Sequence, residues 1–432
     1  MPIFILAASI LGVLHAQNEN LTMSLDQLYQ IADNNNTSIR AFDVAVKEAQ
    51  QAVAAAKADR LPDLKASLSF SYLGNGHITD RDFSNGTTVH IPHYGNNFAL
   101  QAVWAVYTGG AVTAAIDISR LGEKMAKYDA AENRQNVRFI ITAYYLNIHA
   151  LQNQVKVIDE NIALNDSLIA ITRSRLSQGM ALQNDITRYE LQAEKMKLAK
   201  TQAINKTKIL NHQLLTALGV KDGINILTEE DFILDQAESH TEGFWQSTAT
   251  ACAPALRKSD LAVQISSQKE KLEKSERLPK IALFAEDHLD GPITFEIPNL
   301  DNNIHFWYVG VSISYNIASL YKNNKKIRQA RIASRLAGER HTDLAEKVEN
   351  SIQAAYTDYL TSLSELETNT KSVELATQNY DIIYSRYTNG MALVTDMTDA
   401  ANQRLDAQIA LVNSKINILY NYYNLKYLSG TL

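Results

Sequence analysis

The sequence predicts a mainly helical protein whose two halves repeat one architecture, with two β-strands added to each half. Ser174–Asp185 (SRLSQGMALQND) and Ser385–Asp396 (SRYTNGMALVTD) match at seven of twelve positions, at an offset of 211 residues. The triplet Arg60–Pro62 recurs as Arg277–Pro279, at an offset of 217. Only 17 glycines and 7 prolines occur in 432 residues, which favours long uninterrupted elements. A supersecondary unit of about half the chain is therefore present twice.

Each copy of the longer motif predicts the tip of a helical hairpin. Gly179 and Gly390 suit the left-handed position that ends a helix. Asn184 and Thr395, at equivalent places, suit the N-cap of the returning helix. The chain is thus expected to form two long hairpins whose tips are nearly identical in sequence.

Composition and motifs exclude several classes of function. The net charge of −6 gives no basic field, so a nucleic-acid partner is not expected. The single cysteine, Cys252, excludes a disulfide framework and a cysteine-based zinc site. The sequence holds no nucleophile elbow, zinc-protease pair, phosphate loop or dinucleotide fingerprint. We therefore expect neither an enzyme nor a bound cofactor or metal.

The N-terminus predicts export. Residues 1–16 form an apolar run that ends at Ala16, which is typical of a secretory signal peptide. The alternative is a short buried helix. No later stretch reaches the ~18–20 apolar residues of a membrane-spanning helix, so an exported protein of this kind is periplasmic, secreted or a β-barrel.

The predicted organisation is a signal peptide (1–16), a first repeat (17–219), an insert (220–252) and a second repeat (253–432). Residues 24–60 predict one short and one long helix that stop before Pro62. Residues 111–177 contain one glycine and no proline, so they predict a single helix on the order of 100 Å long. Such a helix needs coiled-coil support. Matching long helices are expected at 320–388 and from Asp396 to the C-terminus.

Two strand pairs are predicted, at about 63–107 and about 280–317. Apolar and small or polar residues alternate strictly within them, most clearly in Trp307–Tyr315 (WYVGVSISY). Strands of about ten residues joined by long polar loops are typical of outer-membrane barrels, although a strand pair on a soluble core explains the alternation equally well. Four strands cannot close a barrel, and lipid tolerates no open sheet edge. If the strands lie in a membrane, several chains must share one barrel.

The doubled element order, the GMAL tips and the Asp-x-x-Asp after the second tip resemble the TolC-like outer-membrane efflux proteins. The resemblance covers the whole mature chain. It implies a homotrimer with a twelve-stranded β-barrel in outer-membrane lipid and a helical tunnel in the periplasm. Such a channel is a passive exit duct of a tripartite efflux or type I secretion system. A periplasmic adaptor (membrane fusion protein) docks on its tips, and an inner-membrane pump of the RND or ABC type drives transport.

The resemblance also assigns roles to residues at the tips. It implies a pore constriction at Asp396 and Asp399, where three copies would favour cations. It implies gating links between the hairpins at Asp185, Tyr387 and Asn184, with Asp185 as the partner of Tyr387. The implied adaptor-docking residues are Gly179, Met180, Ala181, Leu182, Gly390, Met391, Ala392 and Leu393. The sequence departs from the family at Ala392, where the family carries a gating arginine, so the arginine latch is expected to be absent.

Simpler interpretations of the same residues stay open. Asp185 and Asp396 gain ~0.3–1 kcal/mol from the helix dipole at a helix start, which alone could account for both. The tip glycines could be helix caps only. His77, His90 and His93 share a loop and are expected to be exposed rather than metal ligands. The alternative function is a periplasmic coiled-coil scaffold or adaptor without a pore.

Overall fold

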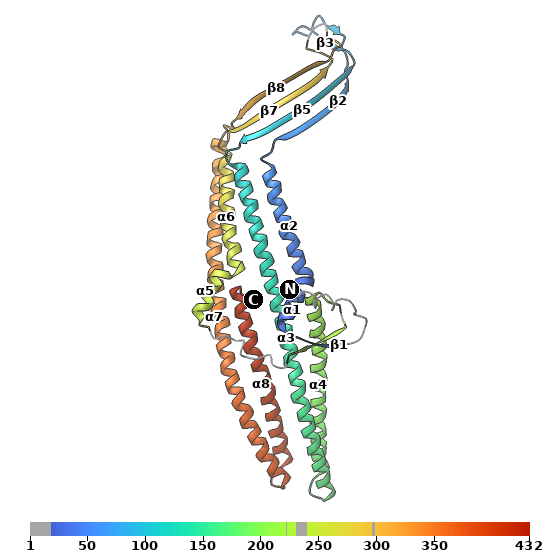
Figure 1. The fold of residues 1–432 in the computed structure, drawn as a ribbon, viewed down its shortest axis with the longest axis vertical. Helices are drawn as coiled ribbons and strands as arrows, with labels where there is room; N and C mark the ends of the chain where they lie inside the picture. Colours follow the sequence, from blue (N-terminus) through green and yellow to red (C-terminus); the bar gives the residue numbers. More distant parts are fainter. Residues whose placement is uncertain (1–18, 222, 230–239, 296–298) are drawn as a thin grey trace, which may run out of the picture. The chain divides into compact units, whose positions relative to one another are not determined.

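A computed structural model describes residues 19–221, 223–229, 240–295 and 299–432. The predicted signal peptide and part of the predicted insert lie outside these residues. The chain forms two compact units (Figure 1). The first contains the described residues of Met1–Val44, Tyr128–Arg257 and Asp343–Leu432, and the second those of Ala45–Lys127 and Lys258–Thr342.

The long helices predicted from the sequence are present. In chain order the helices are α1 (Leu25–Asn35), α2 (Thr37–Ala58), α3 (Ala111–Ser177), α4 (Gln183–Leu218), α5 (Glu242–Cys252), α6 (Pro254–Ser275), α7 (Ser319–Thr388) and α8 (Val394–Ser429). Helices α3 and α7 have 67 and 70 residues, and α4 and α8 have 36 each. Helix α5 lies where the sequence predicted an irregular segment. Within the described part of the chain, no helix is both long and apolar enough to cross a membrane.

The core of the first unit joins the short helix α1 to the long hairpins. Fully buried side chains of this core come from several helices, among them Leu28 of α1, Tyr145 of α3, Leu214 of α4, Ile352 of α7 and Leu425 of α8. Full burial of one such side chain contributes roughly 1.5–3 kcal/mol to folding. The Tyr145 hydroxyl donates to the backbone carbonyl of Met23 at 3.0 Å, so its polar end is satisfied as well.

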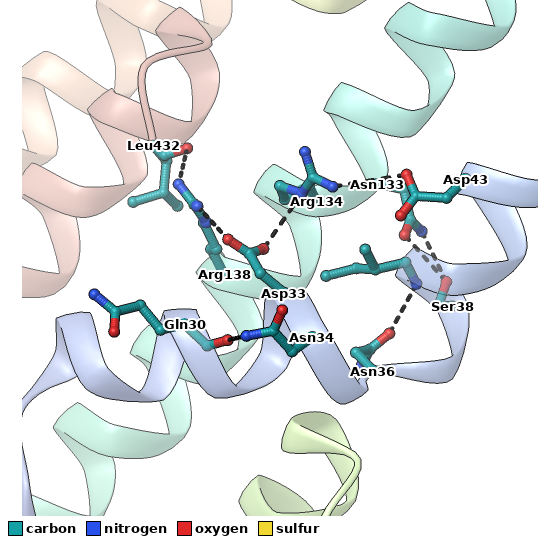
Figure 2. A network of polar contacts seen from close by, with 11 residues as sticks. Gln30, Asp33, Asn34, Asn36, Ser38, Asp43, Asn133, Arg134, Arg138 and Leu432 are labelled. Atoms are coloured by element: carbon teal, nitrogen blue, oxygen red, sulfur yellow. Dashed lines mark hydrogen bonds and ion pairs between the residues drawn. The ribbon is translucent and has the colours of Figure 1, made fainter. Parts of the chain in front are cut away.

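A charged network ties α1 to α3 beside this core (Figure 2). Asp33 lies between two arginines of α3: Arg138 Nη2 is 2.6 Å from Oδ2, and Arg134 Nε is 3.3 Å from Oδ1. The Arg138 guanidinium lies 5.4 Å above the ring of Tyr29, and its Nη1 donates to the Leu432 carbonyl at 3.5 Å. Paired charges of this kind are costly to break because one partner is left partly buried without a counter-ion.

The second unit contains a four-stranded antiparallel sheet (Figure 1). Its strands are β2 (Asp63–Tyr72), β5 (Tyr94–Tyr107), β7 (Lys280–Gly291) and β8 (Ile304–Ser314), in the order β2-β5-β7-β8. The register places Leu64 beside Ala102, Ala102 beside Ala285, and Ala285 beside Val309. The two strand pairs predicted from the sequence therefore join into one sheet.

One face of this sheet is apolar and exposed in the single chain. Its side chains include Leu64, Leu68, Leu100, Trp104, Leu283, Val309, Val311 and Ile313. The opposite face carries Ser67, Ser69, Gln101, Glu286, Tyr308 and Ser312. Strands β2 and β8 are the sheet edges, and no described residue pairs with their outer sides.

Strand bounds and short strands were less well predicted. The alternation of apolar residues predicts a strand from Lys280 to about Glu286, but β7 extends to Gly291, because Asp287, His288 and Asp290 continue the pairing with polar side chains. The loop between β2 and β5 contains a small hairpin of β3 (Gly76–Ile78) and β4 (Thr87–Val89). In the first unit, β1 (Glu19–Met23) pairs in parallel with β6 (Ile224–Thr228). None of these four strands was predicted.

Candidate functional site

The tips of hairpins α3–α4 and α7–α8 form the candidate site, and their backbones are nearly identical. Gly179 and Gly390 have φ angles of 72° and 75°, in the left-handed region predicted for them. Each glycine amide donates to the carbonyl three residues earlier, Leu176 or Tyr387, at 2.9 Å. The following methionine amide donates to the carbonyl of Arg175 or Arg386 at 2.8 Å. This bonding pattern is the Schellman motif, which ends a helix at glycine.

The predicted N-caps at Asn184 and Thr395 are wrong. The caps are Leu182 and Leu393, so α4 and α8 begin two residues earlier than expected. Aspartates perform the capping from inside the helix: Asp185 Oδ2 accepts from the Leu182 amide at 2.9 Å, and Asp396 Oδ2 accepts from the Leu393 amide at 3.1 Å. This is the carboxylate half of a capping box, and it does not need a polar side chain at the cap itself.

Asp396 and Asp399 lie on one exposed side of the first turns of α8. The spacing of three residues makes them neighbours on the helix surface. Asp399 Oδ2 accepts from Gln403 Nε2 at 2.8 Å. The Asp396 carboxylate therefore also stabilises the start of α8. The Asp399 carboxylate accepts from the side-chain amide of Gln403 on its own helix.

Tyr387 joins the two tips. Its side chain is 2% exposed, and its hydroxyl lies 2.8 Å from Oγ1 of Thr172 on α3. Thr172 donates its own proton to the Leu168 carbonyl at 2.7 Å, so Tyr387 is the donor in the bond between hairpins. The structure does not bring Tyr387 to Asp185, which was its predicted partner. The Asp185 carboxylate instead accepts from the amide of Leu182 within its own tip.

Arg175 makes a second link between the tips. Its Nη1 donates to the Tyr387 carbonyl at 2.7 Å, and its guanidinium lies 5.1 Å from the centre of the Tyr387 ring. The sequence interpretation missed this residue because it looked for an arginine at position 392. Ala392 is half-buried against the apolar cluster of the tips. The arginine comes from the other hairpin, four residues before the tip glycine.

Below these links lies a small apolar cluster that buries a second tyrosine. Leu168, Ile186, Tyr189, Tyr380, Tyr387 and Met397 form it. The rings of Tyr189 and Tyr387 are 6.3 Å apart and inclined at 73°. Burial raises the pKa of Tyr189 above its ordinary value, and the nearby Tyr387 hydroxyl and Asp185 carboxylate raise it further. The Tyr189 phenol is thus held neutral between the hairpins.

The outer surface of each tip is apolar. Met180 and Leu182 on the first tip are 61% and 69% exposed, and Met391 and Leu393 on the second are 64% and 69% exposed. Asn184, which was predicted to join the gating links, is exposed beside them. Large apolar side chains concentrated at the end of a helical hairpin are typical of a contact surface for another protein.

The loop histidines of the second unit contact neighbouring groups of the loop and strands. His93 Nδ1 lies 2.8 Å from the Leu73 carbonyl, and its ring stacks on Tyr72 at 5.2 Å. The rings of His90 and His93 meet edge to face at 5.5 Å. Over the described ranges, no three His, Cys, Asp or Glu side chains gather in a way that could hold a metal ion.

Two long helical hairpins together with an antiparallel sheet of one exposed apolar face define a class: subunits of outer-membrane channels. The family model described as outer membrane efflux protein matches the chain twice, at residues 28–220 and 245–431. The chain belongs to the outer membrane efflux protein family, as its sequence resemblance implied. It is a transport channel protein of the outer membrane.

Known relatives match the chain at low identity, one of them over nearly its whole length and others over about a third. The outer membrane efflux protein BepC of Brucella suis is 20% identical over 99% of this chain and 89% of its own length. The outer membrane protein TolC of Escherichia coli is 26% identical over 31% of this chain and 27% of its own length. The crystal structure of CusC superposes with a TM-score of 0.82 at 13% identity, covering 97% of this chain and 95% of that one.

Proposed function

We propose that three copies of this chain form a passive exit duct through the outer membrane. The observation that carries this proposal is the open four-stranded sheet with one apolar face. Its edges β2 and β8 have unpaired backbone groups, and a sheet in lipid must close because unsatisfied backbone groups cost several kcal/mol each. Strand β8 runs antiparallel to β7, parallel to β5 and therefore antiparallel to β2. Joining β8 of one copy to β2 of the next continues the antiparallel order, and three copies give twelve strands.

The proposed duct opens at its periplasmic end. Asp396 and Asp399 are exposed on α8, and three copies would gather six carboxylates around one entrance, which attracts cations and repels anions. The links that hold the tips together in one chain run from Tyr387 to Thr172 and to Arg175. We expect opening to require that the hairpins move apart. Asp185 and Asn184 lie in the first turn of α4 and would take part in links that depend on other copies.

The exposed tip residues support docking of a partner. We propose that Met180, Leu182, Met391 and Leu393 contact a periplasmic adaptor, which connects the duct to an inner-membrane pump of a tripartite efflux or type I secretion system. The half-buried Ala181 and Ala392 and the glycines of both tips shape this surface. The pump, rather than this chain, would supply the energy for transport.

The number of copies and their insertion into lipid test this proposal directly. The protein would be purified from outer membranes in detergent, its mass measured by light scattering with the detergent subtracted, and then reconstituted into liposomes. We expect the mass of three chains and resistance of the liposome-bound protein to alkaline extraction. A protein that leaves the membrane in alkaline buffer and is monomeric would support the scaffold alternative instead.

A further inference from the structure

The internal repeat relates the two hairpins at every level of the tip. Helices α3 and α7 end 211 residues apart, and α4 and α8 start and end 211 residues apart. The bonds around the two tip glycines have the same lengths. For each contact that hairpin α3–α4 makes to the tip of α7–α8, the repeat therefore predicts an equivalent contact. In the equivalent contact, hairpin α7–α8 contacts the tip of an α3–α4 hairpin.

Within the described chain, the contact from hairpin α3–α4 to the tip of α7–α8 is present, and its repeat equivalent is not. The Tyr387 carbonyl accepts two bonds, one from the Gly390 amide and one from Arg175. A Cβ placed on Gly390 would lie 3.0 Å from Arg175 Nη2, so the glycine leaves room for the guanidinium. The equivalent Leu176 carbonyl accepts from the Gly179 amide at 2.9 Å. Apart from its two chain neighbours, no described residue has a heavy atom within 4 Å of a Cβ placed on Gly179.

Arg386 is the repeat equivalent of Arg175, and it is exposed. Among the described residues it has no hydrogen-bond or ion-pair partner for its side chain. In the single chain, Arg386 on one hairpin therefore has no partner among the described residues. On the other hairpin, the space beside Gly179 is open, and the Leu176 carbonyl there can accept a second hydrogen bond. We call this space the Gly179 site.

We propose that Arg386 occupies the Gly179 site of a second copy of the chain and donates a hydrogen bond to the carbonyl of Leu176 of the partner subunit. The inference rests on the proposed oligomeric duct and specifies the contact between its copies. In a ring of copies, hairpin α7–α8 of one chain then holds hairpin α3–α4 of the next, just as Arg175 holds the two hairpins within a chain. The contact from an arginine to a tip carbonyl then recurs around the ring, alternately within and between chains.

Exposed apolar residues lie where this arrangement needs them. Leu375 and Ile382 on α7 are 52% and 60% exposed, and Leu198 on α4 is 59% exposed. Their repeat equivalents are Leu164, Ile171 and Ile409, which are half-buried. Leu164 lines a small cavity together with Leu405 of the other hairpin, so this position belongs to the contact between hairpins. A second copy would cover the exposed set in the same way.

The two kinds of link differ in their hydroxyl groups. Thr172 and Tyr387, which bond within the chain, correspond to Ile383 and Leu176 across the proposed contact. The link between copies therefore has no hydroxyl pair, and Arg386 is the polar group that remains. We expect its loss to weaken the association of copies more than the loss of Arg175 does.

Cysteine crosslinking tests the contact with a matched control. Both variants carry Cys252→Ser, because Cys252 is exposed. The first combines Arg386→Cys with Gln178→Cys, which are predicted to approach between copies. The control combines Arg175→Cys with Asn389→Cys, the equivalent pair within one chain. A flexible bismaleimide about as long as an arginine side chain should give covalent dimers and trimers of the first variant and only monomers of the control.

If the protein is a detergent-stable trimer but the chains of the Arg386→Cys/Gln178→Cys variant are not covalently linked, the proposed contact of Arg386 is wrong. The proposed duct would remain intact. A protein that is monomeric before crosslinking would overturn both. The temperature at which the trimer dissociates in detergent is the second measurement. We expect Arg386→Ala to lower it and Arg175→Ala to leave it nearly unchanged, and equal effects of the two would contradict the proposal.

Discussion

At the second tip, one phenol hydroxyl connects two hairpins that are far apart in sequence. Tyr387 donates to Thr172 from a nearly fully buried position. We expect Tyr387→Phe to remove about 0.5–1.5 kcal/mol of attraction between the hairpins, which is the usual net value of one hydrogen bond. The channel should then open more often in the absence of any partner.

A double-mutant cycle isolates this bond. Tyr387→Phe, Thr172→Val and the double variant would be compared by the fraction of time that single channels are open in planar bilayers. The two single variants should have similar effects, and the double variant should add little to either. Fully additive effects would mean that the hydroxyl pair does not hold the hairpins together.

A glycine at the end of α4 provides a prediction about stability. Gly219 has a φ of 69°, and a Cβ there would collide with the backbone carbonyl of Asn35 at the end of α1. Gly110 has a φ of 88° with open space around it, so Gly110→Ala has only the conformational cost of about 1–2 kcal/mol. We expect Gly219→Ala to lower the midpoint of thermal unfolding more than Gly110→Ala. Equal shifts would show that the close approach of α1 does not matter.

At the residue scale, the sequence predicted what depends on the local backbone. The left-handed glycines at both tips follow from the loop after each helix, and the structure confirms them. The N-caps were placed two residues late, because the capping group is an aspartate inside the helix rather than a residue at the cap. The partners of Tyr387 were not predictable, since they depend on how two hairpins pack. One signal for Arg175 was present in the sequence, since an arginine recurs at the equivalent position of the repeat, Arg386.

At the scale of elements, long periodic patterns gave accurate bounds and short ones did not. Helix α3 has the bounds expected from the stretch between Gly109-Gly110 and the tip, because nothing within it interrupts a helix. The five-residue strands β1 and β6 have no alternation long enough to distinguish them from coil. Strand β7 continues through charged residues because its neighbours on both sides complete the backbone hydrogen bonds.

The apolar face of the sheet gives a prediction for β8. Val311 is 61% exposed on the apolar face, and Ser312 is its neighbour on the opposite face. If the apolar face contacts lipid, Val311→Arg should cost roughly 2–4 kcal/mol near the middle of the bilayer. We expect it to reduce the amount of assembled protein in the outer membrane and its heat resistance on gels. Ser312→Arg should have much less effect, and equal losses from the two substitutions would contradict a lipid-facing role.

At the scale of the whole molecule, three features of the single chain support the proposed assembly. Its sheet has two open edges, its apolar strand face is uncovered and Arg386 lacks a partner within the described chain. The sequence predicted several copies if the strands lie in a membrane, because four strands cannot close a barrel. How the hairpins of neighbouring copies meet was beyond its reach, since that depends on the positions of repeat-equivalent groups in space.

Single-channel recording tests most directly whether the protein forms a cation-favouring duct with carboxylates at its entrance. Purified wild-type protein and the Asp396→Asn/Asp399→Asn variant would be inserted into planar bilayers under a salt gradient. The wild type should form small cation-selective channels, and the variant should lose most of that selectivity together with block by divalent cations. Asp396→Asn also removes a charge that caps α8, so Asp185→Asn serves as the matched control and should keep the selectivity. Unchanged selectivity in the Asp396→Asn/Asp399→Asn variant would contradict the carboxylate entrance. A trimer that carries Tyr387→Phe and Arg175→Ala lacks the tip links, and its failure to conduct would contradict the duct itself.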